Sequence, residues 1–265
     1  IKVDLHKMTE GRQDATIMVA YLEQKERTDE ALLAATAKAD RLLNEIEEMV
    51  AMNCTAVDIA YSPNELYRLK REGKKAIMLG IENGYAIGKD LSRVAHFRKR
   101  GVVYMTLCHN GNNDICGSAR YNEENLGVTP FGEQVIQEMN RLGMMVDLSH
   151  SGERTFYETL DISSQPVVCS HSSSRALCDH PRNLTDDQLR AIARKGGVVQ
   201  VCLYSGFLRK ERPAHILDAI EHLNHMVNVM GIEHVGIGSD FDGDGGIIGC
   251  NDSSEMINQI GRAHV

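Results

Sequence analysis

The feature that most constrains the fold is a repeated alternation of short apolar runs and amphipathic helical segments along the chain. Each run ends near a polar residue, and both of its faces carry apolar or small side chains. Seven runs fit this description: Ala15–Leu22, Ala76–Ile81, Val102–Leu107, Met144–Leu148, Val167–Ser170, Gly197–Leu203 and His234–Ser239. Strands that are apolar on both faces and alternate with helices are typical of a parallel sheet with right-handed crossovers. The sequence therefore predicts an α/β fold.

Two α/β architectures could accommodate these strands. A chain of 265 residues suits one (β/α)8 TIM barrel, which needs eight strands, so one strand is missing, misread or upstream of Ile1. An open doubly wound sheet normally offers a Gly-rich phosphate turn after its first strand. The one candidate, Gly236-Ile237-Gly238, leads into Asp240-Phe241 and not into a helix that opens with Gly. We therefore expect a barrel that lacks its first strand, in a single domain over residues 1–265.

Local signals mark the ends of several helices. Ser62-Pro63-Asn64-Glu65 and Thr185-Asp186-Asp187-Gln188 are capping boxes, and Thr129-Pro130 begins a third helix. Asp29–Val50 is a long helix rich in Ala, Leu and Glu. Helix ends are expected at glycines, which adopt the left-handed conformation readily: Gly73, Gly143 and Gly196. The longest irregular stretch, from His109 to Gly127, is of a length that is usually functional or mobile.

Composition excludes several classes of protein. The net charge is −8 with no basic stripe, so nucleic acid is not an expected partner. No apolar run reaches the length of about 18 residues that a transmembrane helix needs, and the segment Ile1-Lys2-Val3-Asp4 does not read as a signal peptide. Seven cysteines without a CxxC pair indicate mostly free thiols. Three of them lie in apolar strands and are expected to be buried: Cys108, Cys169 and Cys202.

Titratable side chains follow five of the predicted strands. In an α/β barrel the carboxyl ends of the strands gather around one mouth. The residues at or within two positions of those ends are Glu82, His109, His150, His171 and Asp240. Histidine and carboxylate are the donors that zinc and related divalent metals prefer. The sequence thus predicts a metal site at this mouth, and the alternative is a polar mouth that binds a small anion or nothing.

Other candidate sites are weaker. His215, His222 and His225 share a helical face, for which we expect a solvated outer helix and not a metal site. The run Ser172-Ser173-Ser174 is interpreted as a loop and helix start that orient His171, and not as a source of nucleophiles. Neither an HExxH nor a GxSxG motif is present, so the helix-borne zinc protease and the serine hydrolase elbow are both excluded.

Six motifs resemble those of the membrane (renal) dipeptidase family of amidohydrolase-like zinc dipeptidases. They occur in the family's order, and together they are highly specific. The motifs are Leu79-Gly80-Ile81-Glu82-Asn83-Gly84, Thr106-Leu107-Cys108-His109-Asn110, Val146-Asp147-Leu148-Ser149-His150, Ser170-His171-Ser172-Ser173, His180-Pro181-Arg182-Asn183-Leu184-Thr185-Asp186 and Gly236-Ile237-Gly238-Ser239-Asp240-Phe241-Asp242-Gly243. The resemblance covers the chain from Val3 to about Asn251.

The resemblance implies a binuclear zinc centre and a role for each matching residue. Glu82 matches the carboxylate that bridges two metals, and His150 and His171 match the histidines on the second metal. Asp240 matches the aspartate that hydrogen-bonds the bridging water and handles its proton. The family's substrate contacts are a histidine near the scissile carbonyl and an arginine that holds the substrate's free carboxylate; they match His109 and Arg182. The implied activity is hydrolysis of dipeptides, including those with C-terminal D-residues.

The sequence departs from the family pattern at both ends. The family's first strand supplies a His-x-Asp pair to the other metal, whereas this sequence has Asp4-Leu5-His6. We expect the pair and the eighth strand to lie upstream of Ile1. With Glu82, His150 and His171 alone, one metal should be held and two held poorly, so this form is expected to be weakly active or inactive. The pattern also departs after Asn251, where the family continues with another helical segment.

Two other functions remain open from the residues. The same metal site could act on a lactone, a phosphotriester or a cyclic amide, although such substrates have no use for Arg182. A catalytically silent barrel that binds a ligand is the other alternative, supported by the missing His-x-Asp pair. The expected partner is a small dipeptide substrate. Family members are often dimers, so a homodimer is one assembly to test. The location is left open by the residues, with the cytoplasm favoured over a periplasmic or lipid-anchored one.

Overall fold

The chain was analysed as a computed structural model, which describes residues 1–260. It forms two compact units. The central unit comprises Ala15–Val167, and the terminal unit comprises Ile1–Asp14 together with the chain from Val168 onward. The single-domain interpretation over residues 1–265 stays a prediction.

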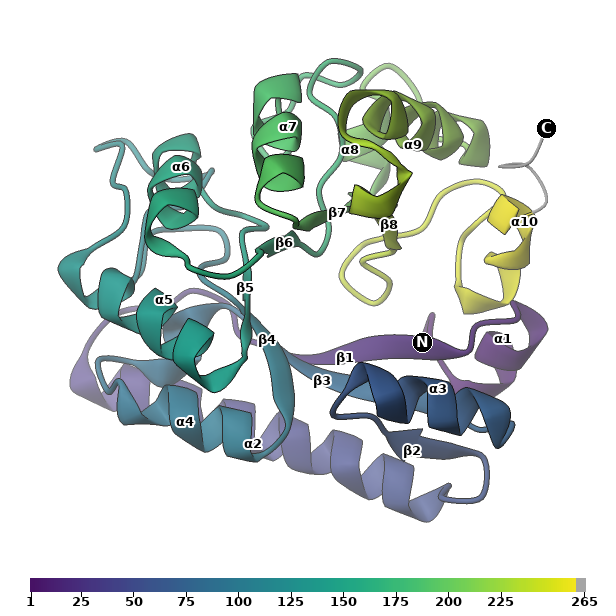
Figure 1. Ribbon diagram of the computed structural model, residues 1–265, viewed down its shortest axis with the longest axis horizontal. Helices are drawn as coiled ribbons and strands as arrows, with labels where there is room; N and C mark the ends of the chain where they lie inside the picture. The colour runs from purple at the N-terminus through teal and green to yellow at the C-terminus, as the bar shows by residue number, and fades with distance from the viewer. Residues whose placement is uncertain (261–265) are drawn as a thin grey trace. The chain divides into compact units, whose positions relative to one another are not determined.

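The central unit is a parallel sheet with helices between its strands (Figure 1). Its strands are β1 (Ala15–Tyr21), β2 (Val57–Ile59), β3 (Lys75–Glu82), β4 (Val102–Thr106) and β5 (Met145–Asp147). Its helices are α2 (Asp29–Met52), α3 (Pro63–Arg71), η1 (Gly84–Ile87), α4 (Ser92–Lys99), α5 (Pro130–Leu142) and α6 (Glu153–Ile162). β3 pairs with β1 along most of its length, with β2 over its first residues and with β4 over its last. The short strand β2 was not predicted, because three residues are too few to show a period.

The terminal unit continues the alternation of parallel strands and helices. Its strands β6 (Val168–Cys169), β7 (Val198–Cys202) and β8 (Val235–Gly238) pair in that order, all parallel. Its helices are α1 (Leu5–Glu10), α7 (Asp186–Arg194), α8 (Ser205–Leu208), α9 (Ile216–Met230), η2 (Ile232–His234), η3 (Ser253–Glu255) and α10 (Ile257–Ile260). All seven predicted strands therefore exist, each within two residues of the expected bounds.

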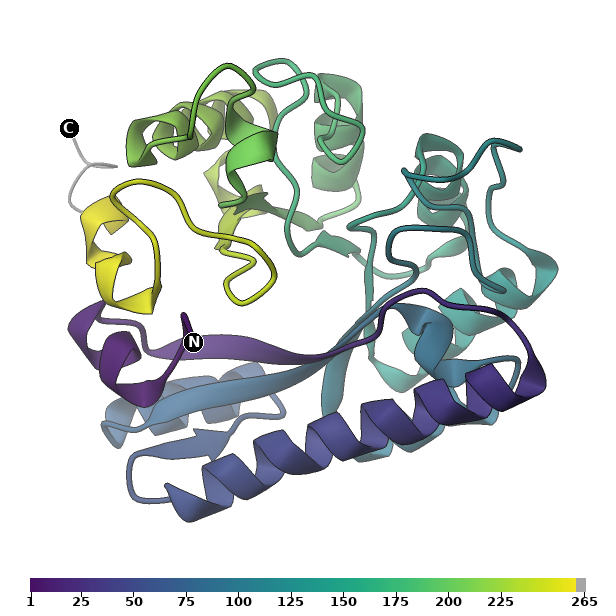
Figure 2. The same cartoon turned by 180° about the vertical axis from the view of Figure 1, so that it is seen from behind.

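The apolar pattern explains how the sheet of the central unit is covered. Every residue of β4 is buried, as are Ile77, Leu79 and Ile81 of β3. On the helix side, α2 buries Leu32, Ala35, Ala39, Leu43 and Val50, which recur at helical spacing, and it packs along β1 (Figure 2). Since apolar groups cover both faces, the strands carry almost no polar side chains until they end.

The predicted helix signals act as caps. The side chains of Ser62, Thr129 and Thr185 each accept a hydrogen bond from a first-turn backbone amide, and Thr185 and Gln188 complete a reciprocal capping box. The predicted end glycines have left-handed backbone: Gly73, Gly143 and Gly196. Within residues 1–260, no helix combines the length and apolar character that crossing a bilayer requires.

The closed eight-stranded barrel is not confirmed. Among the described strands, β1 pairs only with β3 and β8 only with β7, so no pairing closes the sheet. The additional strand β2 pairs with β3 and does not supply the closure, because β3 is already an interior strand. The α/β class and the parallel topology are confirmed, whereas closure into a barrel stays a prediction.

Candidate functional site

Register explains why three of the predicted site residues of the central unit lie together. Glu82, the last residue of β3, pairs with Thr106 of β4, which in turn pairs with Asp147 of β5. His109 and His150 each follow those positions by three residues. Parallel strands aligned in this way present the residues after their carboxyl ends along one edge. The sequence prediction that these side chains converge is confirmed for the central unit.

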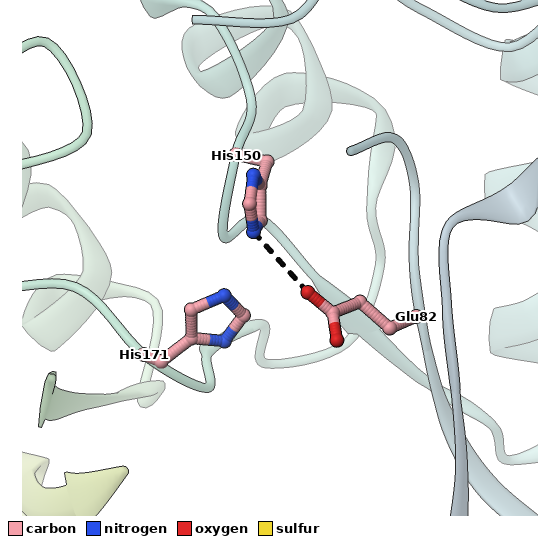
Figure 3. Close-up of side chains that lie close together, drawn as sticks. All are labelled: Glu82, His150 and His171. Atoms are coloured by element: carbon pink, nitrogen blue, oxygen red, sulfur yellow. Dashed lines mark ion pairs between the residues drawn. The ribbon is translucent and has the colours of Figure 1, made fainter. Parts of the chain in front are cut away.

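The three side chains form a compact polar group. Glu82 Oε1 lies 3.2 Å from His150 Nε2 and 3.9 Å from His109 Nε2, and all three side chains are at most 16% exposed. The imidazole rings of His109 and His150 are 4.2 Å apart between centroids. Figure 3 draws Glu82 and His150 with this ion pair dashed, together with His171. The Glu82 oxygen and the His150 nitrogen are donors suited to a divalent cation, and His109 lies beside them.

The orientation of His150 strengthens that interpretation. Its backbone has φ of 71°, a left-handed conformation rare outside glycine, and its carbonyl accepts a 2.7 Å hydrogen bond from Ala119 N. Its Nδ1 lies 3.3 Å from Asn110 Oδ1. Donation from Nδ1 to that oxygen leaves Nε2 with a lone pair facing Glu82 Oε1. Two acceptors at 3.2 Å repel each other unless a proton or a cation lies between them, so the residues present fit a metal ion.

The terminal unit holds the other three predicted site residues. His171 follows β6 by two residues, is 7% exposed, and has its Nδ1 2.8 Å from Ser170 Oγ. Arg182 Nη2 donates a 3.3 Å hydrogen bond to the backbone oxygen of His171. The serine that contacts the His171 ring is therefore Ser170, and the run Ser172–Ser174 is a buried loop, not a helix start.

Arg182 is a buried cation held by an aromatic ring. It is 3% exposed, and its guanidinium carbon lies 5.3 Å from the ring centroid of Phe207 in α8. His180 and Tyr204 contact the same ring at centroid distances of 4.6 and 4.8 Å. Packing against an aromatic ring fixes the orientation of the guanidinium, whose planar array of N–H donors matches a planar anion. A carboxylate is the anion that such a fork binds in bidentate fashion.

Asp240 lies two residues beyond β8 with a left-handed backbone, φ 55°. Desolvation raises the pKa of its carboxyl to about 7, partly offset by the positive charge of Arg182 and by a hydrogen bond from the Cys202 thiol. The Cys202 Sγ to Asp240 Oδ2 distance is 3.7 Å. Burial, followed by the Asp240 charge, raises the pKa of that thiol well above its usual value. Asp240 can therefore hold or release a proton near neutral pH.

The histidines of α9 differ from the sequence interpretation. His222 is 1% exposed, whereas a solvated outer helix was expected. Its Nδ1 accepts from Ser174 N at 3.1 Å and its Nε2 lies 3.2 Å from Leu208 O, so it is a structural core histidine. His215 caps α9 and His225 pairs with Asp186 at 2.8 Å. The solvated-helix interpretation is wrong for His222, because the loop of Ser174 and helix α8 pack against it.

Sequence reasoning missed several residues that support the site. Asn110 orients His150, and the ring of Tyr21 packs edge-on against His109 with centroids 5.0 Å apart. Ser170, Cys202 and Phe207 contact site residues of the terminal unit. Asn110 and Ser170 adjoin predicted site residues inside quoted motifs, so their positions offered a signal. The other three contacts depend on tertiary packing, which no local pattern reports.

Comparison with known proteins identifies what this chain is similar to. Residues 1–260 match the family model described as membrane dipeptidase (peptidase family M19). An uncharacterized dipeptidase of Schizosaccharomyces pombe is 44% identical over 179 residues, which is 66% of this chain and 43% of that protein. The chain spans about half the length of the curated relatives that it matches.

Solved structures agree with the family model. The crystal structure of the probable dipeptidase PvdM from Pseudomonas aeruginosa matches with a TM-score of 0.92 and 27% identity, covering 98% of this chain and 82% of that one. A metallopeptidase from Rhodobacter sphaeroides, liganded with a phosphinate mimic of the dipeptide L-Ala-D-Ala, matches with a TM-score of 0.87 and 25% identity over 99% and 84% of the two chains. The strand-end side chains described above therefore lie in a fold shared with metal-dependent peptidases.

Proposed function

Because the chain belongs to the membrane dipeptidase family, peptidase family M19, we propose that it is a zinc-dependent dipeptidase. The observation that carries the proposal is the 3.2 Å distance between Glu82 Oε1 and His150 Nε2. Both atoms are electron-pair donors, and one cation could coordinate both of them. The metallopeptidase structures among its relatives support the same reading. The proposal therefore combines donor chemistry with family membership.

We propose that His171 completes the ligand set begun by Glu82 and His150. Each of the three residues offers one ligand atom, an imidazole nitrogen or a carboxylate oxygen. Each lies at or just beyond the carboxyl end of a parallel strand, where such folds assemble their sites. Imidazole and carboxylate donors favour zinc among the common divalent ions. Glu82 has two carboxylate oxygens, so it could also bind a second ion. We therefore propose a site for two zinc ions.

A divalent cation bound there would polarise the scissile carbonyl and lower the pKa of water. The chain's own groups supply the remaining chemistry. Arg182 binds the substrate's terminal carboxylate, which fixes the position of the adjacent peptide bond. His109 lies beside Glu82 and donates a hydrogen bond to the oxygen that becomes negative as the bond is attacked. Asp240, whose pKa is about 7, takes a proton from water and returns it to the leaving amine.

The substrate class follows from Arg182. Arg182 is buried and donates a hydrogen bond to the backbone of His171, a proposed metal ligand, so a carboxylate that it holds would lie close to the scissile bond. This restricts the substrate to dipeptides and other very short peptides. Tolerance for D-residues at the C-terminal position is proposed as well, because a relative binds a mimic of L-Ala-D-Ala.

The test is hydrolysis of a dipeptide panel by the purified chain, with zinc supplied or removed by a chelator. With three ligands the cleavage of free dipeptides is expected to be weak, but it should require metal. The matching dipeptide amides, which lack the carboxylate, should be cleaved much more slowly. Elemental analysis of the same preparation counts the bound ions. Metal binding with equal cleavage of acids and amides would contradict the role of Arg182, and no cleavage of any dipeptide by a metal-loaded full-length protein would end the proposal.

Homodimer formation and a cytoplasmic location are also proposed. Light scattering of the purified protein tests the first, and cell fractionation tests the second.

A further inference from the structure

A buried pair of asparagine side chains adjoins the strand ends that carry Glu82 and His109. Asn83 follows Glu82 in the chain, and Asn113 belongs to the long loop that begins with His109. Both are at most 1% exposed, and Asn113 Nδ2 donates a 3.1 Å hydrogen bond to Asn83 Oδ1. We propose that this amide pair is the positioning device that sets Glu82 and His109 together for metal and substrate. The inference rests on the proposed function for the roles of those two residues.

Each amide of the pair uses its full hydrogen-bonding capacity. Asn83 Nδ2 donates to Leu22 O at 3.0 Å and to Gln24 Oε1 at 3.2 Å, while its Oδ1 accepts from Tyr85 N at 3.1 Å as well as from Asn113. An asparagine side chain has two donors and room for two acceptor bonds, so Asn83 is saturated. Because a buried amide with partners on every side is costly to move, the residue preceding it is held in place.

Asn113 is saturated in the same way. Its Nδ2 also donates to Leu107 O at 2.8 Å, and its Oδ1 accepts from Ile115 N at 2.9 Å and from Cys116 N at 3.0 Å. Leu107 lies two residues before His109, so the amide ties the start of the loop that carries this histidine to its middle, at Ile115 and Cys116. The pair thus connects three chain segments: the residues after β1, after β3 and after β4.

Backbone geometry shows that the connection constrains Glu82. Asn83 has φ of 87°, a left-handed conformation that a non-glycine residue adopts only when its surroundings impose it. The next residue, Gly84, approaches the β4 loop so closely that a Cβ would lie 2.9 Å from Leu107 O and 2.4 Å from Ile115 Cδ1. The chain therefore turns sharply after Glu82 against the loop of His109, and the amide pair fills that turn.

The alternative is that the pair only stabilises the fold, and metal affinity separates the two cases. Residues that orient metal ligands typically change metal affinity or activity by 10–100-fold when replaced. Asn83→Gly removes the amide while keeping a residue that adopts positive φ without strain, so this variant is expected to fold. Asn113→Ala breaks the pair from the other side, and Gln24→Ala removes one peripheral bond as a milder change. Asn140→Ala is the matched control, because Asn140 Oδ1 accepts three hydrogen bonds from Ser163 and Ser164, residues that belong to no part of the site.

The experiment measures zinc affinity by chelator competition, the thermal midpoint, and kcat and KM for a dipeptide. We expect Asn83→Gly and Asn113→Ala each to weaken zinc binding by roughly 10–100-fold, with the double variant little worse than either, because both break the same connection. Asn140→Ala should lower the midpoint and leave zinc affinity unchanged.

If both site variants lower the midpoint as the control does but keep zinc affinity within twofold, the pair is structural and the inference is wrong. If the parent binds zinc, the variants weaken it, and no dipeptide is cleaved, the inference stands and the proposed function fails. A parent protein that binds no zinc overturns both.

Discussion

The two units of the molecule use the same device, residues placed at the ends of parallel strands, for different chemistry. In the central unit the strand ends carry Glu82, His109 and His150, and the Glu82 carboxylate lies 3.9 Å from His109 Nε2 and 3.2 Å from His150 Nε2. In the terminal unit Arg182 and Asp240 provide a cation and a carboxyl whose pKa is raised to about 7. The first group suits the binding of a cation, and the second suits binding an anion and moving a proton.

The supporting contacts differ in the same way. Neutral amides support the donors of the central unit. Asn110 contacts His150, and Asn83, which is hydrogen-bonded to Asn113, follows Glu82 in the chain. Apolar and weakly polar groups lie beside the charged residues of the terminal unit, where Arg182 lies over the Phe207 ring and Asp240 accepts a hydrogen bond from the Cys202 thiol. Amides fix direction without adding charge, whereas an apolar environment shifts pKa values and strengthens charge–charge attraction.

Both units store backbone strain at these positions. His150 and Asp240 have φ of 71° and 55°, and Asn83 has 87°. A left-handed non-glycine residue costs on the order of 1 kcal/mol, and such residues cluster at functional sites. The three residues lie one, three and two positions beyond the ends of β3, β5 and β8, so the strain lies next to the proposed site.

The largest expected effect is loss of the carboxylate in the central unit. Glu82→Gln keeps the volume but replaces an anionic ligand with a neutral amide, so zinc affinity and kcat/KM should each fall by more than about a hundredfold, the upper end for residues that only orient ligands. Chelator competition and dipeptide kinetics measure the two quantities. A Glu82→Gln protein that binds zinc as the parent does would show that the central unit is not the metal-binding half.

Asp240→Asn should separate metal binding from turnover. The amide cannot carry the transferred proton, so kcat should fall by about 10²–10⁴, the range typical of a lost general acid–base residue, while zinc content stays unchanged. Steady-state kinetics and elemental analysis on one preparation are sufficient. Parental turnover in this variant would contradict the proton-transfer role, and loss of zinc would make Asp240 part of the metal half.

Arg182→Ala should act on substrate binding. Removing one partner of a buried charged contact costs about 2 kcal/mol or more, so KM for a free dipeptide should rise roughly 30-fold or more with a smaller change in kcat. The dipeptide amide is the control, since it lacks the carboxylate and should lose little. An equal loss for acid and amide would mean that Arg182 supports the structure and not substrate recognition.

The smallest expected effect on activity comes from lowering the pH, which should change the stability of the terminal unit through His222. This change is also a sharper test of the comparison between the two units. Burial lowers the pKa of His222 from 6.5 to about 4, and its hydrogen bonds from Ser174 N and to Leu208 O require the neutral ring. Because the folded pKa is depressed, the stabilisation is complete above pH 6.5 and is lost as pH falls toward 4. Between pH 6.5 and 5 the loss should be about 2 kcal/mol, from 1.36 kcal/mol for each pH unit.

Amide hydrogen exchange at pH 7.5 and pH 5 locates this effect. After correction for intrinsic rates, protection should fall in α9 and in the loop of Ser174, and should hold in α2 of the central unit. His222→Gln should reduce the difference between the two pH values. A uniform loss of protection in both units would show that His222 does not dominate the acid response.

Several parts of the site could be predicted from local sequence because their cause is local. The strands were recognised from apolar runs, the helix ends from Ser62, Thr129 and Thr185, and the site residues from their positions after the strands. Asn83 and Asn113 could not be assigned a role, because a 30-residue separation hides their contact. His222 was misjudged for the same reason: the residues that bury it are 14 and 48 positions away.

What the sequence by itself determined is the parallel α/β alternation and the identity of the donors at the strand ends, since periodicity and residue chemistry are properties of short segments. Only the tertiary structure decided which donors meet, how His150 and Asp240 are turned, and why the Asp240 carboxyl holds its proton near neutral pH. Those properties arise from register, burial and hydrogen bonds between distant segments, and none of them exists until the chain has folded.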